Sequence, residues 1–216
     1  MISKFLYILR ERKLLKSKNN NALKLFNTNQ VIFFHIPKTG GNSILKSLYG
    51  NIDFGHRDVA YYKAIFGKNK FNSFYKFCVV RNPYERLYSA YSFLKKGGMN
   101  KMDKNFNDIY LKKYHSFDDF VKSGLNNKHI KNWIHFKPQH SFILDKNNQI
   151  CVDFVAKLEN IENDFNIIKD KLQIRDVCLS HLNKTKKYPL TMTPEIKQII
   201  QKHYQKDFEL FYKNLL

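Results

Sequence analysis

A lysine, a threonine and two adjacent glycines follow directly on an apolar run near the start of the chain. The run spans residues 31–34, and its β-branched and aromatic side chains predict a buried strand. Residues 38–41 (Lys-Thr-Gly-Gly) come next, and an apolar stripe over residues 44–48 predicts a helix after them. A glycine loop between a strand and a helix start turns backbone N–H groups toward an anion, and lysine adds a full charge. This order of elements predicts a phosphate or sulfate site.

Six loop residues are candidates for contacts with the anion. They are Lys38 by its charge, Thr39 and Ser43 by their hydroxyls, Gly40 and Gly41 by their backbone N–H groups, and Asn42 by its amide. The loop is not a Walker A motif, in which the lysine follows the second glycine, because Lys38 precedes both glycines. The loop by itself therefore leaves an ordinary strand-to-helix turn as an alternative.

A second block, residues 74–96, favours the anion site. Its apolar run over residues 77–80 predicts a strand of a parallel sheet, and Arg81 stands at the carboxyl end of that strand. Asn82 and Pro83 predict a helix N-cap and first helical position. Ligands of open α/β sheets bind beyond the carboxyl ends of strands, so we expect Arg81 on the same rim as Lys38. Arg86 is interpreted equally well as an anion ligand or as a packing ion pair.

Together, HIPKTGGNS (residues 35–43) and VVRNPYERLYSAY (residues 79–91) resemble two motifs of the sulfotransferases that use 3′-phosphoadenosine 5′-phosphosulfate (PAPS). The first resembles their 5′-phosphosulfate loop and the second their 3′-phosphate segment, with Arg81 and Ser89 as the phosphate grip. The similarity is greatest to the carbohydrate branch, which includes the heparan-sulfate 2-O-, HNK-1 and chondroitin types. Asn42 departs from the family, which usually has threonine or a similar small hydroxyl residue there. We expect altered contacts at Asn42 rather than lost binding.

The resemblance extends thinly to about residue 213. A strand within residues 152–158 and a helix over residues 161–172 are similar to the later elements of the family. HLNKTKK, residues 181–187, resembles the basic loop that closes over the nucleotide, which makes Lys184 and Thr185 cofactor-binding candidates. Thr193 and Pro194 predict the start of the last helix.

The resemblance implies a fold and a division of the chain. We expect an α/β fold with a P-loop-like parallel sheet flanked by helices, in a single sulfotransferase domain over residues 31–216. Residues 1–30 are expected to form a basic, amphipathic N-terminal extension. The chain is long enough to bury one sizeable core.

Sulfuryl transfer to a hydroxyl needs a charge clamp and a base, by analogy with phosphoryl transfer. Lys38 is the candidate clamp. In the 2-O-sulfotransferase branch a Gly-His element supplies the base, and His56 resembles its histidine, so His56 is the second catalytic candidate. The remaining candidates for the base are His35, His140, Asp53 and Asp58. No metal is implied.

The net charge of +20 and the pI of about 9.8 favour anionic partners. The resemblance implies two of them, the PAPS donor and a saccharide acceptor. A basic nucleic-acid-binding module is a rival interpretation, but no nucleic-acid fold motif is found and no nucleic acid is expected. A related kinase or NTPase is the other alternative, and the lack of a Walker A loop and of a magnesium-binding Asp after a strand argues against it. The oligomeric state is left open.

The first 18 residues contain only a short apolar run, too short for a signal peptide or a membrane span. They predict a cytoplasmic protein with an amphipathic N-terminal helix. That helix is either packed or frayed, or makes weak peripheral contact with anionic lipid.

Two further segments carry structural expectations. Residues 97–113 are polar and begin with two glycines, which predicts a long loop. Cys78, Cys151 and Cys178 have no metal-binding spacing and lie in apolar contexts, so we expect core thiols.

Overall fold

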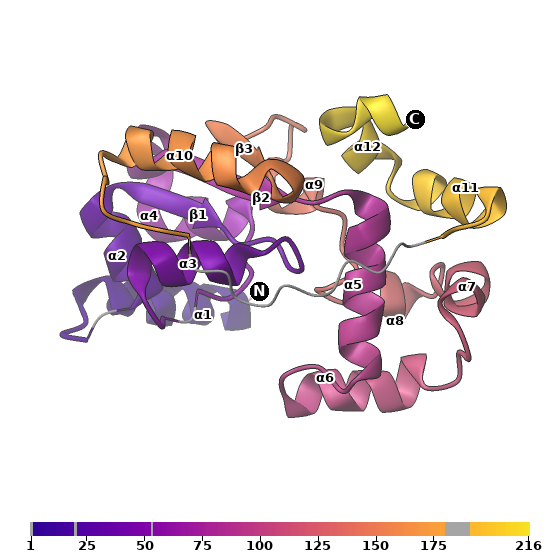
Figure 1. Cartoon of the computed structure of the whole chain (residues 1–216). Helices are drawn as coiled ribbons and strands as arrows, with labels where there is room; N and C mark the ends of the chain where they lie inside the picture. The colour runs from indigo at the N-terminus through magenta and orange to yellow at the C-terminus, as the bar shows by residue number, and fades with distance from the viewer. Residues whose placement is uncertain (1, 20, 53, 180–190) are drawn as a thin grey trace. The chain divides into compact units, whose positions relative to one another are not determined.

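The computed structural model describes residues 2–19, 21–52, 54–179 and 191–216, with side chains from Leu6 onward (Figure 1). Its elements in chain order are α1 (Ile2–Lys13), η1 (Leu14–Lys16), α2 (Ala22–Asn29), β1 (Val31–Phe34), α3 (Gly41–Tyr49), α4 (Val59–Ser73), β2 (Tyr75–Val80), α5 (Pro83–Lys95), α6 (Lys101–Phe106), η2 (Asn107–Leu111), α7 (Phe117–Asp119), η3 (Phe120–Gly124), α8 (Lys128–Lys131), α9 (His140–Ile143), β3 (Phe154–Lys157), η4 (Leu158–Asn160), α10 (Ile161–Leu172), α11 (Pro194–His203), α12 (Gln205–Phe211) and η5 (Lys213–Leu215). The chain divides into two compact units. Unit 1 comprises Met1–Ile36, Gly40–Val80 and Ser141–Lys184, and unit 2 comprises Pro37–Thr39, Arg81–His140 and Thr185–Leu216.

Unit 1 is built on a parallel sheet, in which the described strands run in the order β1–β2–β3 (Figure 1). The register pairs Phe33 with Phe77 and Phe77 with Phe154. All of β1 and all but the first residue of β2 are buried, as in parallel sheets covered by helices. The strands predicted at residues 31–34, within 74–96 and within 152–158 are confirmed, and with them the α/β class and the parallel sheet.

Helices α2, α3, α4 and α10 surround these strands in unit 1 (Figure 1). Helix α10 buries Phe165 and Ile168, as its apolar spacing predicts. Helix α4 is broken at Gly67, whose φ of 75° lies in the left-handed region that glycine adopts at little cost.

The N-terminal helix α1 is packed against α4. The Arg12 guanidinium donates two hydrogen bonds, of 3.0 and 2.6 Å, to the carbonyl oxygen of Ala64. The Tyr61 hydroxyl donates to Glu11 Oε2 at 2.6 Å. Leu6 on the same helix is 58% exposed. Among the residues that the structure describes, no helix is long and apolar enough to cross a membrane.

Unit 2 begins its helical part with α5, which starts as the sequence predicts. The Asn82 side chain accepts a hydrogen bond from the Tyr84 N–H at 3.0 Å, and Pro83 occupies the first turn. Helix α11 starts in the same way, with Thr193 as N-cap and a proline in the first turn. Ser116 caps α7 by accepting a hydrogen bond from the Asp119 N–H at 3.0 Å.

The prediction of a long loop at residues 97–113 is wrong. Most of the segment is helical, in α6 and the π-helical η2. Two features that the polar composition obscures account for this. Asn100 caps α6 by accepting from the Asp103 N–H, and Phe106 stacks on Trp133 with ring centroids 4.2 Å apart.

The prediction of three core thiols holds only for Cys78, which lies in β2 and is fully buried. Cys151 is half-buried and Cys178 is exposed. Cys151 and Cys178 lie outside the regular elements, before β3 and after α10, where apolar neighbours in the sequence do not imply burial.

Candidate functional site

In unit 1, the glycine loop opens helix α3. Gly40 is the N-cap of the helix, with φ 79°, and its carbonyl accepts the Ser43 N–H at 3.1 Å. Asn42 is exposed at the first turn, and Ser43 is half-buried beside it. The buried Ile44 and Leu45 hold the helix in the unit, so its N-terminal N–H groups have a fixed direction.

Gly41 fits closely against the imidazole of His35. A Cβ atom at Gly41 would lie 2.3 Å from His35 Cδ2 and 3.3 Å from the Phe33 ring. No larger residue fits without displacing the histidine, which is 9% exposed. The loop and the end of β1 are therefore closely matched in shape.

His56 contacts His35 through both the backbone and the ring of that residue. Its Nδ1 donates a hydrogen bond to the His35 carbonyl oxygen at 2.8 Å, and the two imidazole centroids are 4.4 Å apart. A proton held on Nδ1 makes Nε2 the nitrogen with the lone pair. The geometry thus gives His56 the tautomer that a general base needs.

The segment that follows His56 is braced by α1. The Arg57 guanidinium lies over the rings of Tyr7 and Tyr61, 5.9 and 5.1 Å from their centroids. Tyr61 is in turn bonded to Glu11 of α1. These contacts restrict the backbone next to His56, and nothing in the sequence pattern indicates them.

In unit 2, Lys38 adopts a strained conformation over an aromatic ring. Its φ is 68°, a left-handed value that costs a side-chain-bearing residue about 1–2 kcal/mol. Its ammonium lies 3.9 Å from the centroid of the Phe93 ring. The pKa of Lys38 is lowered to about 8, mainly because the ammonium is buried and secondly because the positive charge of Arg81 is near.

Arg86 anchors the backbone that leads into Lys38. It is 2% exposed, its Nε donates to the Pro37 carbonyl at 2.9 Å, and its Nη1 donates to the Lys137 carbonyl at 2.9 Å. Of the two interpretations of Arg86, the packing role is therefore the one that the geometry supports, through carbonyl oxygens rather than an ion pair.

Arg81 is held by its backbone and by its side chain. The Gln139 amide accepts the Arg81 N–H at 2.9 Å and donates to the Arg81 carbonyl at 2.8 Å. The buried Asp207 carboxylate accepts the Gln139 N–H at 2.7 Å. The Arg81 guanidinium pairs with Glu85 at 3.0 Å. The backbone of Arg81 is thus fixed by residues of unit 2 that lie far along the chain.

The Arg81 guanidinium is suited to an anionic ligand. Its Nε is buried and has no hydrogen-bond partner within the described ranges. An unsatisfied buried donor costs about 1–3 kcal/mol, and a phosphate or sulfate oxygen removes that cost. With Lys38 close enough for its pKa to respond to Arg81, these two residues fit an anionic donor.

The predicted site residues fall into two described groups. In unit 1, residues 40–43 and His56 are brought together through His35. In unit 2, Lys38 and Arg81 are brought together, Thr39 is fully buried, and Ser89 lies half-buried on α5. The predicted Lys184 and Thr185 contacts lie outside the described residues.

Sequence reasoning missed the residues that support the site. Phe93 under Lys38, and Gln139 with Asp207 behind Arg81, are absent from the motifs. Gln139 is 58 residues from Arg81 in the chain, so no local spacing could reveal the contact.

The chain is also similar to known proteins. A stretch of 109 residues, 49% of this chain, is 34% identical to an uncharacterized protein of Archaeoglobus fulgidus and covers 73% of it. No solved structure matches the chain. A model of the sulfotransferase family matches residues 21–213, which include both motifs, His56 and the described part of unit 2 up to the start of η5. The chain belongs to the sulfotransferase family.

Proposed function

We propose that this protein transfers a sulfuryl group from PAPS to a hydroxyl group of a carbohydrate. The observation that carries the proposal is the cationic pair of unit 2, in which Lys38 lies close enough to Arg81 for that charge to lower its pKa and Arg81 Nε has no partner among the described residues. Membership of the sulfotransferase family supports the same reaction class. The similarity of the two motifs to the carbohydrate branch supports a saccharide acceptor.

The donor contacts follow the chemistry of the side chains. Residues 38–43 bind the 5′-phosphosulfate through backbone N–H groups, hydroxyls and the Lys38 ammonium. Arg81 and Ser89 bind the 3′-phosphate, for which a planar guanidinium is better suited than an ammonium. The resemblance of residues 181–187 to the family's basic loop makes Lys184 and Thr185 further candidates for nucleotide contacts. When bound, PAPS supplies the sulfuryl group and the phosphate leaving group.

The protein contributes a base and a charge. His56 keeps its proton on Nδ1, where the His35 carbonyl accepts it, and takes the proton of the acceptor hydroxyl at Nε2. Lys38 supplies positive charge where negative charge develops during transfer. The Phe93 ring beneath the Lys38 ammonium and the hydrogen bond from Arg86 to the Pro37 carbonyl hold Lys38 in position before the donor binds. Binding therefore costs little conformational entropy at Lys38.

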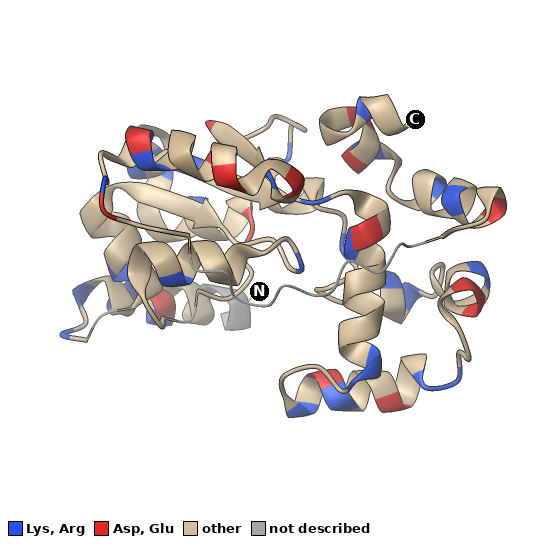
Figure 2. Ribbon diagram, in the orientation of Figure 1, with Lys and Arg blue, Asp and Glu red and all other residues tan. Residues whose placement is uncertain are grey.

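The alternatives are less well supported. The loop has no Walker A lysine, which disfavours a kinase or NTPase. Figure 2 shows lysine and arginine spread over many elements of each unit rather than gathered along one helix or strand. Such scattered charge is a weak basis for nucleic-acid binding.

Calorimetry with two nucleotides tests the proposal. We expect 3′-phosphoadenosine 5′-phosphate to bind without magnesium and more tightly than ATP. Incubation with PAPS and a set of oligosaccharides should then give a sulfated product by mass spectrometry. Magnesium-dependent ATP binding, with no response to the 3′-phosphorylated nucleotide, would exclude the proposed function.

A further inference from the structure

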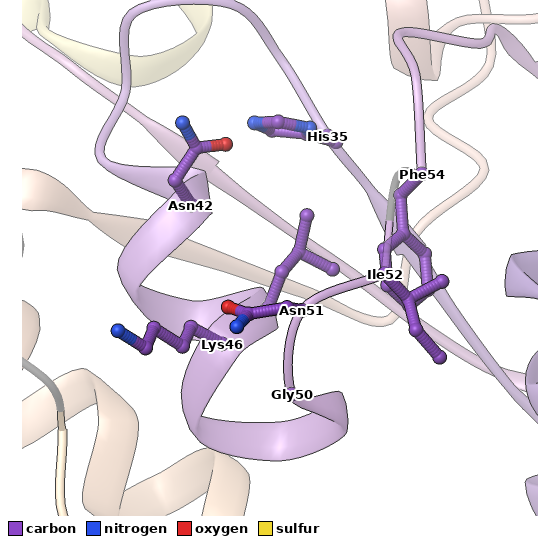
Figure 3. Close-up of a pocket in the computed structure, with 8 residues that line it drawn as sticks. His35, Asn42, Lys46, Gly50, Asn51, Ile52 and Phe54 are labelled. Atoms are coloured by element: carbon purple, nitrogen blue, oxygen red, sulfur yellow. The ribbon is translucent and has the colours of Figure 1, made fainter.

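The backbone that carries His56 belongs to no helix or strand. Residues 54–58 lead into α4 without regular secondary structure, so their position depends on side-chain contacts. At the start of this segment Phe54 is buried, with its ring 5.1 Å from that of Phe26 and 5.2 Å from that of Tyr49. Phe54 also lines the pocket of about 250 Å³ that Figure 3 shows beside α3. The segment is therefore anchored before the histidine.

The other end of the segment is anchored by the start of α4. Asp58 caps that helix by accepting the Tyr61 N–H at 2.8 Å. Between the two anchors, the Arg57 side chain packs back on Gly55, where an added Cβ atom would lie 3.8 Å from Arg57 Cζ. Arg57 thus follows His56 in the backbone and touches, with its guanidinium, the residue that precedes it.

Helix α1 fixes the Arg57 guanidinium in this place. Tyr7 and Tyr61, which lie under the guanidinium, have ring centroids 6.4 Å apart. The Tyr61 hydroxyl donates to Glu11 at 2.6 Å. Burial, and next the hydrogen bond to Glu11, raise the pKa of Tyr61 well above its usual range, so the hydroxyl keeps its proton and remains a donor. We call Glu11, Tyr7, Tyr61 and Arg57 the Arg57 clamp.

Two members of the clamp come from a helix that the family match does not include. The model of the sulfotransferase family begins to match at residue 21, whereas α1 ends at Lys13. The orientation of α1 is also unusual for a helix that only covers apolar surface, which would bury leucine and expose glutamate. Leu6 is instead 58% exposed, and Glu11 is half-buried in its bond to Tyr61.

We infer that the Arg57 clamp positions His56 for proton transfer, so that α1 contributes to turnover without touching the donor. The inference rests on the proposed function, in which His56 is the base, and adds positioning residues to it. The His35 carbonyl orients the imidazole ring, and the clamp holds the backbone that carries the ring. Both are needed because a displacement of about 1 Å at a reacting group can lower a rate about 100-fold.

The first test removes the guanidinium. Arg57→Ala should lower kcat about tenfold to 100-fold, measured with the oligosaccharide that mass spectrometry finds sulfated. Its KM for PAPS and its affinity for 3′-phosphoadenosine 5′-phosphate should stay unchanged. In a His56→Ala background, Arg57→Ala should cause no further loss, because the clamp acts only through His56. Unchanged kcat in the single variant, or additive losses in the double variant, would overturn the inference.

The second test uses two substitutions of Glu11. Glu11→Gln keeps a side-chain oxygen that accepts the Tyr61 hydroxyl and should retain most of the kcat. Glu11→Ala removes the acceptor and should lower kcat about threefold to tenfold. Arg10→Gln, at an exposed position of the same helix, is the control and should change neither kcat nor KM. Equal kcat in Glu11→Ala and Glu11→Gln would contradict the clamp.

NMR of the ¹⁵N-labelled full chain tests the clamp without turnover. In the unmodified protein the His56 Nδ1–H, bonded to the His35 carbonyl, should exchange slowly with water. Exchange should be faster in Arg57→Ala and Glu11→Ala, and unchanged in Glu11→Gln and Arg10→Gln. Unchanged exchange in Arg57→Ala would overturn the inference and leave the proposed function standing. If the unmodified protein transferred no sulfuryl group, the proposed function would fail by itself, and exchange of Nδ1–H would still decide whether the clamp holds His56.

Discussion

His56 Nδ1 donates to the backbone carbonyl of His35, the residue directly after β1, across 2.8 Å. A backbone acceptor does not titrate and is retained whatever side chain occupies position 35. The tautomer of His56 is therefore set by the sheet rather than by a second ionisable group. This differs from His140, whose Nδ1 lies 2.7 Å from the Asp207 carboxylate.

The first prediction separates chemistry from binding at His56. His56→Ala should lower turnover about 10²- to 10⁴-fold, because the acceptor hydroxyl loses its base. Affinity for 3′-phosphoadenosine 5′-phosphate should stay nearly intact. The fall in rate at acidic pH should also disappear, since protonation of His56 no longer inactivates the enzyme. Steady-state rates across pH and calorimetry measure both effects.

The matched control for His56 is His140→Ala, which removes a histidine that also has a defined partner. We expect it to retain turnover apart from effects on stability. A rate loss of that size in His140→Ala, with full activity in His56→Ala, would assign the base to His140.

The second prediction concerns the shape of the loop. Gly41→Ala should push the His35 ring out of its position, because the added methyl would lie 2.3 Å from it. Overpacking of this kind costs about 1–3 kcal/mol of stability. Turnover should fall as well, since the displaced ring contacts His56. Thermal unfolding and rate measurements report the two losses separately.

Gly67→Ala serves as the control for Gly41→Ala. Its added methyl would meet no atom within 4 Å, but its φ of 75° strains any other residue. It should lose stability without losing turnover once folded. Equal turnover in the two variants would show that the fit of Gly41 to His35 has no catalytic importance.

The third prediction tests the 3′-phosphate role of Arg81. Arg81→Lys keeps the charge and can still pair with Glu85, but it replaces a two-pronged contact by a single point. Charge-assisted hydrogen bonds are worth about 1.5–3 kcal/mol, so affinity for the 3′-phosphorylated nucleotide should fall tenfold or more. Affinity for adenosine 5′-phosphate should change little.

Arg175→Lys makes the same substitution at an exposed position and should affect neither nucleotide. An equal loss for both nucleotides in Arg81→Lys would contradict a 3′-phosphate contact. Arg81 would then affect nucleotide binding indirectly, by supporting the fold of unit 2 through its backbone hydrogen bonds with Gln139.

The parts of the fold that could be predicted from the sequence are those with local signals. Val31–Phe34 forms the expected strand because its residues suit a buried parallel sheet, and Asn82 with Pro83 starts α5 because a cap and a proline act within one turn. The loop motif likewise placed Gly40 and Gly41 at the start of α3, where the geometry requires them.

The remaining features depend on contacts between distant residues. Helix α6 forms in a polar segment because Phe106 finds Trp133, which lies well beyond it in the chain. Gln139 contacts Arg81, which lies 58 residues away in the sequence of unit 2, so the contact depends on how that whole segment folds. Gly50 turns the chain after α3 back on that helix and so helps to form a pocket whose lining includes His35, Asn51 and Phe54. The residue types alone do not show the direction of that turn.

The fourth prediction uses the titration of Lys38. Burial and the neighbouring Arg81 lower its pKa to about 8 from an ordinary 10.5, while Asp103 opposes and Arg86 adds to that shift. The protonated lysine attracts the anionic nucleotide, so binding must raise the pKa again. At pH values between the Lys38 pKa of the free protein and that of the complex, each unit of rising pH should then weaken binding by up to about tenfold. Below about pH 8, Lys38 should contribute no pH dependence.

Calorimetry of 3′-phosphoadenosine 5′-phosphate from about pH 7.5 to about pH 9.5 measures the Lys38 effect, because the nucleotide phosphates, with a second pKa of about 6, no longer titrate in that range. The dissociation constant should rise with pH above about 8, and binding should take up a proton, seen as a heat that depends on the buffer. Lys38→Arg is the control, since its guanidinium stays charged throughout. The variant should bind with little pH dependence and without proton uptake. The same slope in both proteins would mean that a group other than Lys38 titrates, and Lys38 would then keep its charge despite its burial over Phe93.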